Sequence, residues 1–393
     1  MDKMNNLVSS NVSSMELSAI MEMEMRGSMM TDVASLSLGL PSFRTPETIR
    51  QFVQQHLDGD SDIGKYSLAD GLPELRKAVA EFHHFQTGVC VDPDRHVVIT
   101  AGNMQGLNLL LHMLINPGDE IIMTDPGFPS HTQQIRLCGG NTVYWTMDEA
   151  AGWTLDLNGL ADLITERTKA IIIVSPSNPT GKIFTADELR YVGQIARKHN
   201  LLILIDDPYG HFTYENDEKH FNLSSIQELA DNIVYLYTFS KAHAMSGWRL
   251  GYMILSEQLK QEILKVHDAT LICAPRISQI AGLAALRKHS AYLGEFKEIL
   301  AKRRRLTCER LDRLPHVFDY VKPEGAYYVF PKLMLEHTNS LSFSLELLEK
   351  TKVAVTPGRA FGPMGEHHIR MAYCKSEETI ELAFDRIEKR FPA

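Results

Sequence analysis

The sequence predicts an α/β protein with a mixed, mostly parallel sheet that carries helices on both faces, and with a smaller α+β domain. Short apolar runs alternate with helical patterns from about residue 95 to residue 205. Runs such as 170–174 contain no polar residue and are bounded by Gly, Pro or Asn, which is typical of strands buried on both faces. Because such strands alternate with helices, we expect them to pair in parallel.

The expected elements follow one another in a regular order. Seven strands are expected in the large sheet, at residues 96–100, 120–123, 141–146, 170–174, 201–205, 234–238 and 250–255. Helices are expected between them at residues 104–115, 130–137, 157–164 and 186–199. A linker helix near 292–313 then leads to a second sheet pattern at 326–330 and 369–373. We therefore predict an arm with part of the small domain in 1–45, a large domain in 46–288 and a small C-terminal domain in 289–393.

Composition and charge exclude several classes of protein. With 44% hydrophobic and 23% charged residues, the chain has ample apolar material for a core, which excludes disorder of the whole chain. The net charge is −9, and the one basic run, 302–305, is expected to form a solvated helix face, so we expect no nucleic-acid partner. The five cysteines lack metal-ligand spacing, and no apolar run is long enough to span a membrane. We therefore predict an unprocessed cytoplasmic protein without a metal site, a disulfide framework or a membrane contact.

The segment 15–30 is rich in methionine, and Met21, Met23 and Met25 alternate with glutamate. This alternation gives a helix no clean apolar face, and flexible thioether side chains suit packing on a groove or on a partner subunit. The segment could instead line a ligand pocket and favour an apolar substrate side chain. Both interpretations remain open at this stage.

Polar phrases follow the predicted strands at their carboxyl ends, where open α/β sheets bind ligands. The first phrase, 100–106, is a strand-to-helix turn in which the backbone of Gly102 and Asn103 could bind an anion or simply form the turn. Asn178 in the second phrase could donate to a ligand oxygen, or only form a turn. Asp206 ends a buried strand and must be paired, either by capping the next element or by holding a cationic ligand nitrogen.

Lys241 is the candidate nucleophile. A lone lysine is normally solvated, but this one follows an apolar strand and has small or apolar neighbours. Burial would lower its pKa and make the neutral amine available. Ser240 and Arg249 offer a hydroxyl and a cationic fork that suit a phosphate. Arg370 interrupts an apolar strand pattern and could bind a carboxylate, or could lie on the surface of an edge strand.

An amine for a Schiff base, an aspartate for a pyridinium nitrogen and an anion cradle together meet the needs of pyridoxal phosphate. With these residues, the chain resembles the fold-type I, class I/II aminotransferases of the aspartate aminotransferase superfamily. The resemblance extends over nearly the whole chain, from 38–43 to Arg370, and its most specific part is Ser240-Lys241 followed by 247–251. It also rests on the order and spacing of Asn178, Asp206, Tyr209, Lys241, Arg249 and Arg370.

The resemblance implies a role for each matching residue. Lys241 is expected to form the Schiff base and to move the proton, and Asp206 to keep the pyridine nitrogen protonated. Asn178 and Tyr209 are expected to bind the phenolic oxygen of the cofactor, and Phe128 to stack on its ring. The residues expected to hold the phosphate are Gly102, Asn103, Met104, Ser240, Arg249 and, from the neighbouring subunit, Tyr66. Those expected to bind the substrate carboxylate are Arg370, Asn178 and the backbone of Gly39.

The resemblance implies transfer of an amino group from an L-amino acid to a 2-oxo acid by a symmetric homodimer with shared sites. A carbon–sulfur β-lyase or synthase would share these motifs, because they hold the cofactor and do not choose the fate of the carbanion. A cofactor-binding regulator is a third possibility, although residues 1–30 are short and acidic for a DNA-binding domain. Met104, Asp207 and His243 depart from residues common in the family. A dicarboxylate substrate would need a second cation, and Arg44 is the candidate, with a surface turn as its alternative interpretation.

Overall fold

The large sheet has eight strands in the part of the chain that the computed structural model describes, residues 7–214, 220–288, 291–335 and 339–392. Their order across the sheet is β2 (Val97–Thr100), β9 (Gly251–Ile254), β8 (Ile233–Thr238), β7 (Leu202–Asp207), β6 (Thr168–Val174), β3 (Glu120–Asp125), β4 (Asn141–Asp148) and β5 (Thr154–Leu155). Neighbours from β8 to β4 are parallel, whereas β9 is antiparallel to both of its neighbours and β5 to β4. The prediction of a mixed, mostly parallel sheet is confirmed, and the two-residue β5 adds one strand to the seven expected.

Residues of the strands from β2 to β3 across the sheet alternate between two apolar clusters, one on each face. In β6, Ile171 and Ile173 belong to one cluster, and Ile172 and Val174 to the other. Three helices cover the second face, namely α6 (Asn103–Leu114), α7 (Pro129–Leu137) and α10 (Glu257–Thr270). Three others cover the first face, namely α4 (Pro73–Thr87), α9 (Ala186–Lys198) and α11 (Arg276–Lys288). Burial on both faces explains why the strands are uninterrupted apolar runs.

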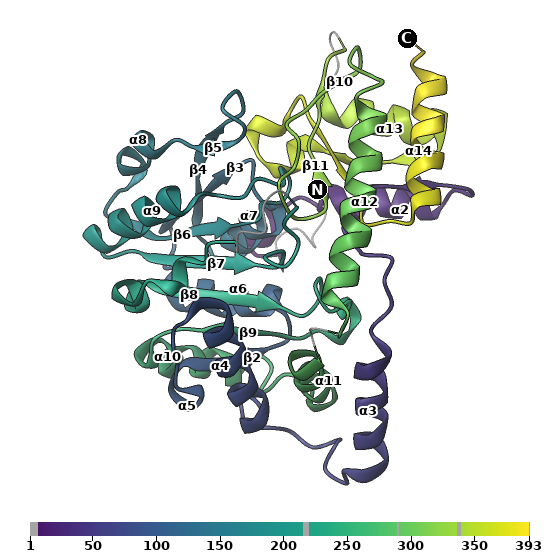
Figure 1. The fold of residues 1–393 in the computed structure, drawn as a ribbon. Coiled ribbons are helices and arrows are strands. Elements are labelled where there is room, and N and C mark those ends of the chain that lie inside the picture. Colours follow the sequence, from purple (N-terminus) through teal and green to yellow (C-terminus); the bar gives the residue numbers. More distant parts are fainter. Residues whose placement is uncertain (1–6, 215–219, 289–290, 336–338, 393) are drawn as a thin grey trace.

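A second group of elements lies beside the large sheet, and α12 (Leu293–Leu311) runs along the boundary between the two (Figure 1). It includes a three-stranded antiparallel sheet of β11 (Tyr328–Val329), β15 (Ile369–Ala372) and β14 (Thr356–Pro357). Smaller elements complete it: β10 (Phe318–Asp319), β12 (Lys332–Leu333), α13 (Ser340–Thr351) and α14 (Glu377–Arg390). β1 (Ala34–Ser35) pairs in parallel with β13 (Val353–Ala354), so the start of the chain joins its C-terminal part. The domain boundaries stay a prediction.

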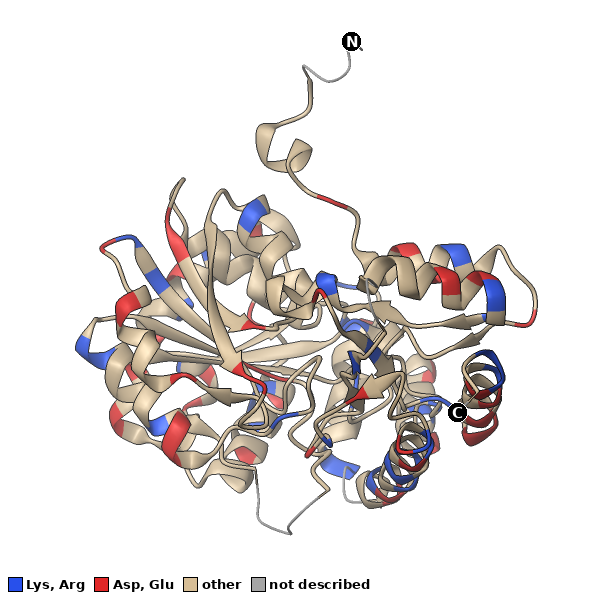
Figure 2. Cartoon of the chain, turned by 90° about the horizontal axis from the view of Figure 1, so that it is seen from above, with Lys and Arg blue, Asp and Glu red and all other residues tan. Residues whose placement is uncertain are grey.

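The ribbon of the N-terminal segment projects from the body of the molecule in Figure 2, and the segment contacts α7. It contains α1 (Ser10–Ser13) and α2 (Ala19–Ser28), and two hydrogen bonds tie it to α7, from Asn11 Nδ2 to Leu137 O at 3.2 Å and from Arg136 Nη1 to Ser14 O at 2.8 Å. Of the methionines of α2, Met23 is buried, whereas Met21 is about half exposed. The remaining helices are α3 (Glu47–Gly59), α5 (Pro93–His96) and α8 (Leu157–Leu160); the last is shorter than the helix predicted at 157–164, because a 3₁₀ turn at Ala161–Leu163 follows it.

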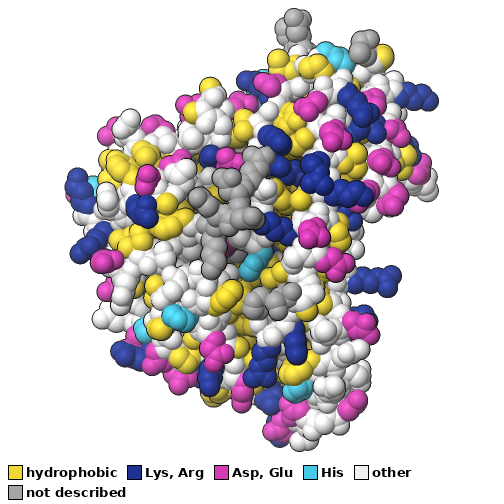
Figure 3. Space-filling view, in the orientation of Figure 1, with side chains coloured by type: hydrophobic (Ala, Val, Ile, Leu, Met, Phe, Trp, Pro, Cys, Tyr) yellow, Lys and Arg dark blue, Asp and Glu magenta, His cyan; other side chains and the backbone are white. Residues whose placement is uncertain are grey.

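The basic run 302–305 differs from its prediction as a solvated helix face. Arg303 and Arg304 of α12 are buried, and their guanidinium groups donate to the carbonyls of Cys374 at 3.2 Å and Pro323 at 2.6 Å. A helical pattern alone could not reveal that segments before and after α12 would pack over it. On the face seen in Figure 3, acidic and basic side chains are interspersed. Among the described helices, none has both the length and the apolarity needed to span a membrane.

Candidate active site

A cavity of about 390 Å³ opens at the carboxyl ends of the large-sheet strands, where the sequence places its polar phrases. Most of the predicted site residues line it: Gly39, Asn103, Met104, Phe128, Asn178, Asp206, Tyr209, Ser240, Lys241, Arg249 and Arg370. Ser18, Ile20 and Met21 of the N-terminal segment also line it. Residues from strand ends, from the N-terminal segment and from the C-terminal β15 therefore meet in one place.

Asp206 is held from two sides at the end of β7. Its Oδ1 accepts a hydrogen bond from Asn103 Nδ2 at 2.6 Å, and its Oδ2 lies 3.0 Å from His131 Nε2. His131, in the first turn of α7, is buried, and its Nδ1 has no hydrogen-bond partner among the described residues. His131 was not among the residues predicted from the sequence, and Asn103 was predicted to act at the phosphate, mainly through its backbone. The available signal was a histidine in a helix that begins at the same edge of the sheet.

Lys241 lies in the turn after β8 and is partly buried. Its Nζ donates to Gly39 O at 3.0 Å. The pKa of Lys241 is lowered from 10.5 to about 8, mainly because the amine is removed from water. The positive charges of Arg370 and Arg249 also lower this pKa, whereas Cys374 and Asp206 raise it. An appreciable fraction of this amine is therefore neutral near physiological pH.

The anion cradle combines a helix N-terminus with a cation. Gly102 caps α6 with φ 82° and no side-chain hydrogen bond, which leaves the first N–H groups of the helix without intrahelical partners. The positive φ of Gly102 favours glycine, and a Cβ there would lie 2.8 Å from Arg249 Nη2, so this guanidinium would have to move. Arg249 adopts φ 52°, and its Nη1 donates to Ser246 O at 2.8 Å. Ser240 Oγ accepts from Thr238 Oγ1 at 3.0 Å. This arrangement suits a phosphate.

Met104 lies in the first turn of α6, and its side chain is 41% exposed. Its carbonyl accepts a hydrogen bond from Gln134 Nε2 at 3.0 Å. The prediction that Met104 serves an anion through its backbone N–H agrees with this position. Its thioether faces the cavity as an apolar lining group.

Arg370 is buried on β15, which excludes its interpretation as a surface residue of an edge strand. Its guanidinium donates to Asn178 Oδ1 at 3.1 Å and to Ser37 O, and it stacks against the ring of Tyr328 at 4.5 Å. No carboxylate within the described residues forms a salt bridge with it, and its Nε has no partner. A buried guanidinium without an acidic partner favours an anionic ligand.

Tyr209 is buried, and its hydroxyl lies 3.0 Å from the hydroxyl of Tyr328. Burial, together with the nearby Tyr328, raises the pKa of Tyr209 well above 10, so its phenol stays protonated and can donate. A Cβ at Gly39 would overlap the hydroxyl of Tyr328, so the close packing of residue 39 against Tyr328 requires glycine. The sequence analysis identified 326–330 as a strand but did not assign Tyr328 to the site.

Phe128 precedes α7 and lines the cavity, with its ring edge-on to His131 at a centroid distance of 5.3 Å. Two other predicted residues lie elsewhere. Tyr66 is 75% exposed and does not line the cavity within one chain. Arg44 is exposed on the turn before α3 and also lies outside the lining.

Comparison with known proteins gives a consistent result. The family model for aminotransferase class I and II matches residues 31–387. An aspartate aminotransferase of Pyrococcus horikoshii is 35% identical over 390 residues, with 99% of this chain and 98% of that protein covered. Aromatic-amino-acid aminotransferase 2 of Thermococcus litoralis is 32% identical, with 91% of each chain covered.

Solved structures agree. The structure of Thermus thermophilus aspartate aminotransferase with maleate superposes with a TM-score of 0.91 at 29% identity, over 97% of this chain and 99% of that one. The structure of Thermotoga maritima aspartate aminotransferase gives 0.89 at 32% identity, over 98% and 100%. These relatives are transferases, so the comparisons support amino-group transfer and do not favour the lyase alternative. The chain thus belongs to the class I and II aminotransferase family and is a transaminase.

Proposed function

We propose that the cavity binds pyridoxal 5′-phosphate and that the protein moves an amino group from an L-amino acid with an apolar side chain to a 2-oxo acid. The observation that carries this proposal is a single cavity lined by an amine of lowered pKa at Lys241 and by the carboxylate of Asp206. These two groups are what a pyridoxal aldehyde and a pyridinium nitrogen require.

The residues present fit this cofactor. Asp206 is fixed by Asn103 and His131, so its orientation is set before a ligand binds. The α6 N-terminus and Arg249 suit the phosphate, the buried phenol of Tyr209 and the Asn178 amide suit the phenolic oxygen, and Phe128 suits the ring face. When bound, the cofactor supplies an electrophilic carbon and a cationic ring that accepts the electron pair released at the substrate α-carbon.

Lys241 acts as both the attachment point and the base. Its Nζ would hold the cofactor and, when not attached to it, would take the proton from the substrate α-carbon. Burial lowers the pKa of this amine to about 8 in the site without a ligand, so part of it is neutral and able to accept a proton. Asp206 holds a proton on the ring nitrogen through its negative charge, which makes proton removal from the substrate easier.

Arg370 orients the substrate. Its planar guanidinium binds a carboxylate through two parallel hydrogen bonds, which sets the direction of the α-carbon toward Lys241. Asn178 fixes the guanidinium through the bond at 3.1 Å, and Tyr328 supports it from one face. The carbonyl of Gly39 lies next to the amine and accepts a hydrogen bond from Lys241 Nζ.

The rest of the cavity supports an apolar substrate side chain. The cations among the described residues that line it are Lys241, Arg249 and Arg370, and each already has a role above. Ile20, Met21 and Met104 contribute apolar lining. A carboxylate on the substrate side chain would therefore find no free cation within one chain, whereas a methionine or leucine side chain would bury apolar surface.

Two further features belong to this proposal. Ser240 and the backbone of Gly102, Asn103 and Met104 complete the phosphate site within one chain, and Tyr66 completes it from a second copy in a symmetric homodimer. The exposure of Tyr66 is compatible with such a contact. All five cysteines are free thiols, which suits a reducing compartment, and we infer the cytoplasm.

A half-reaction screen tests the proposal. The purified protein is loaded with pyridoxal phosphate, and loss of its visible absorption band is followed with each amino acid. We expect the band to disappear fastest with methionine, leucine or phenylalanine, with the matching 2-oxo acid as product. A strong preference for aspartate would refute the apolar substrate class, and pyruvate plus ammonia from a cysteine conjugate would favour the β-lyase.

A further inference from the structure

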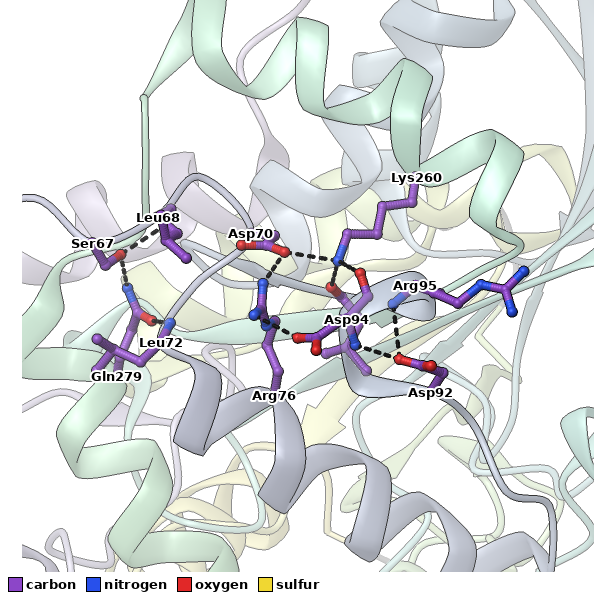
Figure 4. A network of polar contacts seen from close by, with 11 residues as sticks. Ser67, Leu68, Asp70, Leu72, Arg76, Asp92, Asp94, Arg95, Lys260 and Gln279 are labelled. Atoms are coloured by element: carbon purple, nitrogen blue, oxygen red, sulfur yellow. Dashed lines mark hydrogen bonds and ion pairs between the residues drawn. The ribbon is translucent and has the colours of Figure 1, made fainter.

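A buried network of polar contacts holds residues 67–72, the loop between Tyr66 and α4 (Figure 4). The side chain of Gln279, on α11, is completely buried and contacts both ends of this loop. Its Nε2 donates to Ser67 Oγ at 2.8 Å, and its Oε1 accepts from Leu72 N at 2.7 Å. Nε2 also donates to Ala274 O at 2.8 Å, so both N–H groups and the oxygen of the amide are engaged and only one orientation satisfies them.

The middle of the loop is anchored separately, through Asp70 (Figure 4). Its carboxylate accepts from Lys260 Nζ at 2.8 Å and forms an ion pair with Arg76. The side chains of Lys260 and Arg76 are only 6% exposed, and Lys260 Nζ also donates to the carbonyls of Asp94 and Val97. The loop is thus fixed against α4, α10 and the edge strand β2.

The residues on the outer side of this loop are exposed. Tyr66 is 75% exposed and Leu68 59%, and they flank the anchored Ser67. A side chain that must reach a ligand on another chain loses less conformational entropy on binding when its backbone is already fixed. The contacts of Ser67 therefore set the direction in which Tyr66 leaves the surface.

We propose that Gln279 is a positioning residue, whose buried amide fixes the loop after Tyr66 and thereby aims this tyrosine at the cofactor phosphate of a second copy of the chain. The inference rests on the proposed function, because Tyr66 and the phosphate have their roles from it. Gln279 is a sharper target than Lys260, because removal of Lys260 would also take a positive charge from the buried cluster around the Asp70–Arg76 ion pair.

A double-mutant cycle on cofactor affinity tests this inference. Pyridoxal phosphate is titrated into the apoprotein dimers of the parent, Tyr66→Phe, Gln279→Leu and the double variant, and the visible band gives each dissociation constant. Loss of one hydrogen bond to a charged phosphate should weaken binding by about tenfold in Tyr66→Phe. Gln279→Leu should weaken it by a similar factor, and the double variant should be no weaker than the weaker single variant.

Three controls separate positioning from a general loss of structure. Pyridoxal, which lacks the phosphate, should bind all four proteins equally, whereas a disturbed fold would weaken its binding too. Gln86→Leu, the same change at the far end of α4, should bind pyridoxal phosphate like the parent. Ser67→Ala, which removes only the hydroxyl that Gln279 contacts, should give a smaller loss that disappears in the Tyr66→Phe background.

The outcomes distinguish this inference from the proposed function. Unchanged affinity in Tyr66→Phe would overturn the role of Tyr66 and the inference with it. Weakened binding in Tyr66→Phe with unchanged binding in Gln279→Leu and Ser67→Ala would overturn the inference alone. Losses that multiply in the double variant would also overturn it, because they would show that Gln279 acts independently of Tyr66.

Discussion

On the sheet side of the cavity, Asp206 is held between the half-buried Asn103 and the buried His131. On the N-terminal side, the cavity is bounded by Ile20 and the half-exposed Met21 of α2. We call the first region, Asn103, His131, Asp206 and Lys241, the floor, and the second, Ser18, Ile20 and Met21, the wall. The floor lies at the ends of strands packed on both faces. The wall belongs to a helix with a single buried residue, Met23.

This difference separates two tasks within one cavity. Proton transfer requires groups whose distances and pKa values are fixed, and buried hydrogen-bonded side chains provide them. Selection among apolar side chains requires contact area and tolerates adjustment, which unbranched methionine provides. Changes in the floor should therefore reduce turnover with every substrate, and changes in the wall should alter the ranking of substrates.

The largest effect is expected from Lys241→Ala. Loss of the positioned base should lower turnover by about 10²–10⁴-fold with every amino acid, because this kind of proton transfer contributes that much. Steady-state assays with several amino acids measure it, beside Lys265→Ala, an exposed lysine of α10 that should behave like the parent. Turnover within tenfold of the parent would contradict the role of Lys241.

A comparison of two adjacent aspartates should give the next largest effect. Asp206→Asn removes the charge that we propose faces the cofactor nitrogen, and it should lower turnover by about 10²–10³-fold, as for other fixed groups that stabilise transition-state charge. Asp207 instead accepts from Tyr235 Oη at 2.9 Å and from Gly210 N at 2.8 Å and does not line the cavity. Asp207→Asn should therefore lower the midpoint of denaturation, whereas the turnover of the folded variant should stay close to that of the parent. Equal losses of turnover in both variants would remove the distinction.

The rate at which the apoprotein binds pyridoxal phosphate should depend on pH, and this dependence tests the lowered pKa of Lys241 in the floor. Because the pKa of Lys241 is lowered to about 8, the neutral amine fraction should rise about tenfold from about pH 7 to about pH 9 and then level off. The rate at which apoprotein develops the visible band after mixing with pyridoxal phosphate should follow this rise. A rate that keeps climbing toward pH 10.5 would show a lysine with an ordinary pKa.

The smallest effect is expected at the wall. Met21→Ala removes apolar contact from a half-exposed side chain and should lower kcat/KM for methionine or leucine by about tenfold at most, while alanine as substrate is nearly unaffected. Met25→Ala, on the same helix but outside the cavity lining, is the matched control. If Met21→Ala lowered kcat/KM equally for large and small substrates, Met21 would contribute to the stability of the fold and not to substrate selectivity.

The sequence alone was sufficient to predict the positions of site residues that lie at the ends of strands. Asp206 and Lys241 could be placed because each follows a buried strand, and parallel strands bring their carboxyl ends to one edge. His131 and Tyr328 could not, because their contribution depends on how a helix and a strand are rotated about their own axes. The burial of Arg303 and Arg304 had the same cause, since it depends on which segments pack over α12. Tyr66 lies outside the cavity of one chain, and its role at the site of a second chain stays a prediction.

The most direct test of the central claim is to reduce the protein with borohydride after loading with pyridoxal phosphate, and then to map the product by peptide mass spectrometry. The account predicts one pyridoxyl-phosphate adduct, on Lys241, and none in Lys241→Ala. An unlabelled Lys241, or an adduct on another lysine such as Lys182 or Lys260, would contradict it.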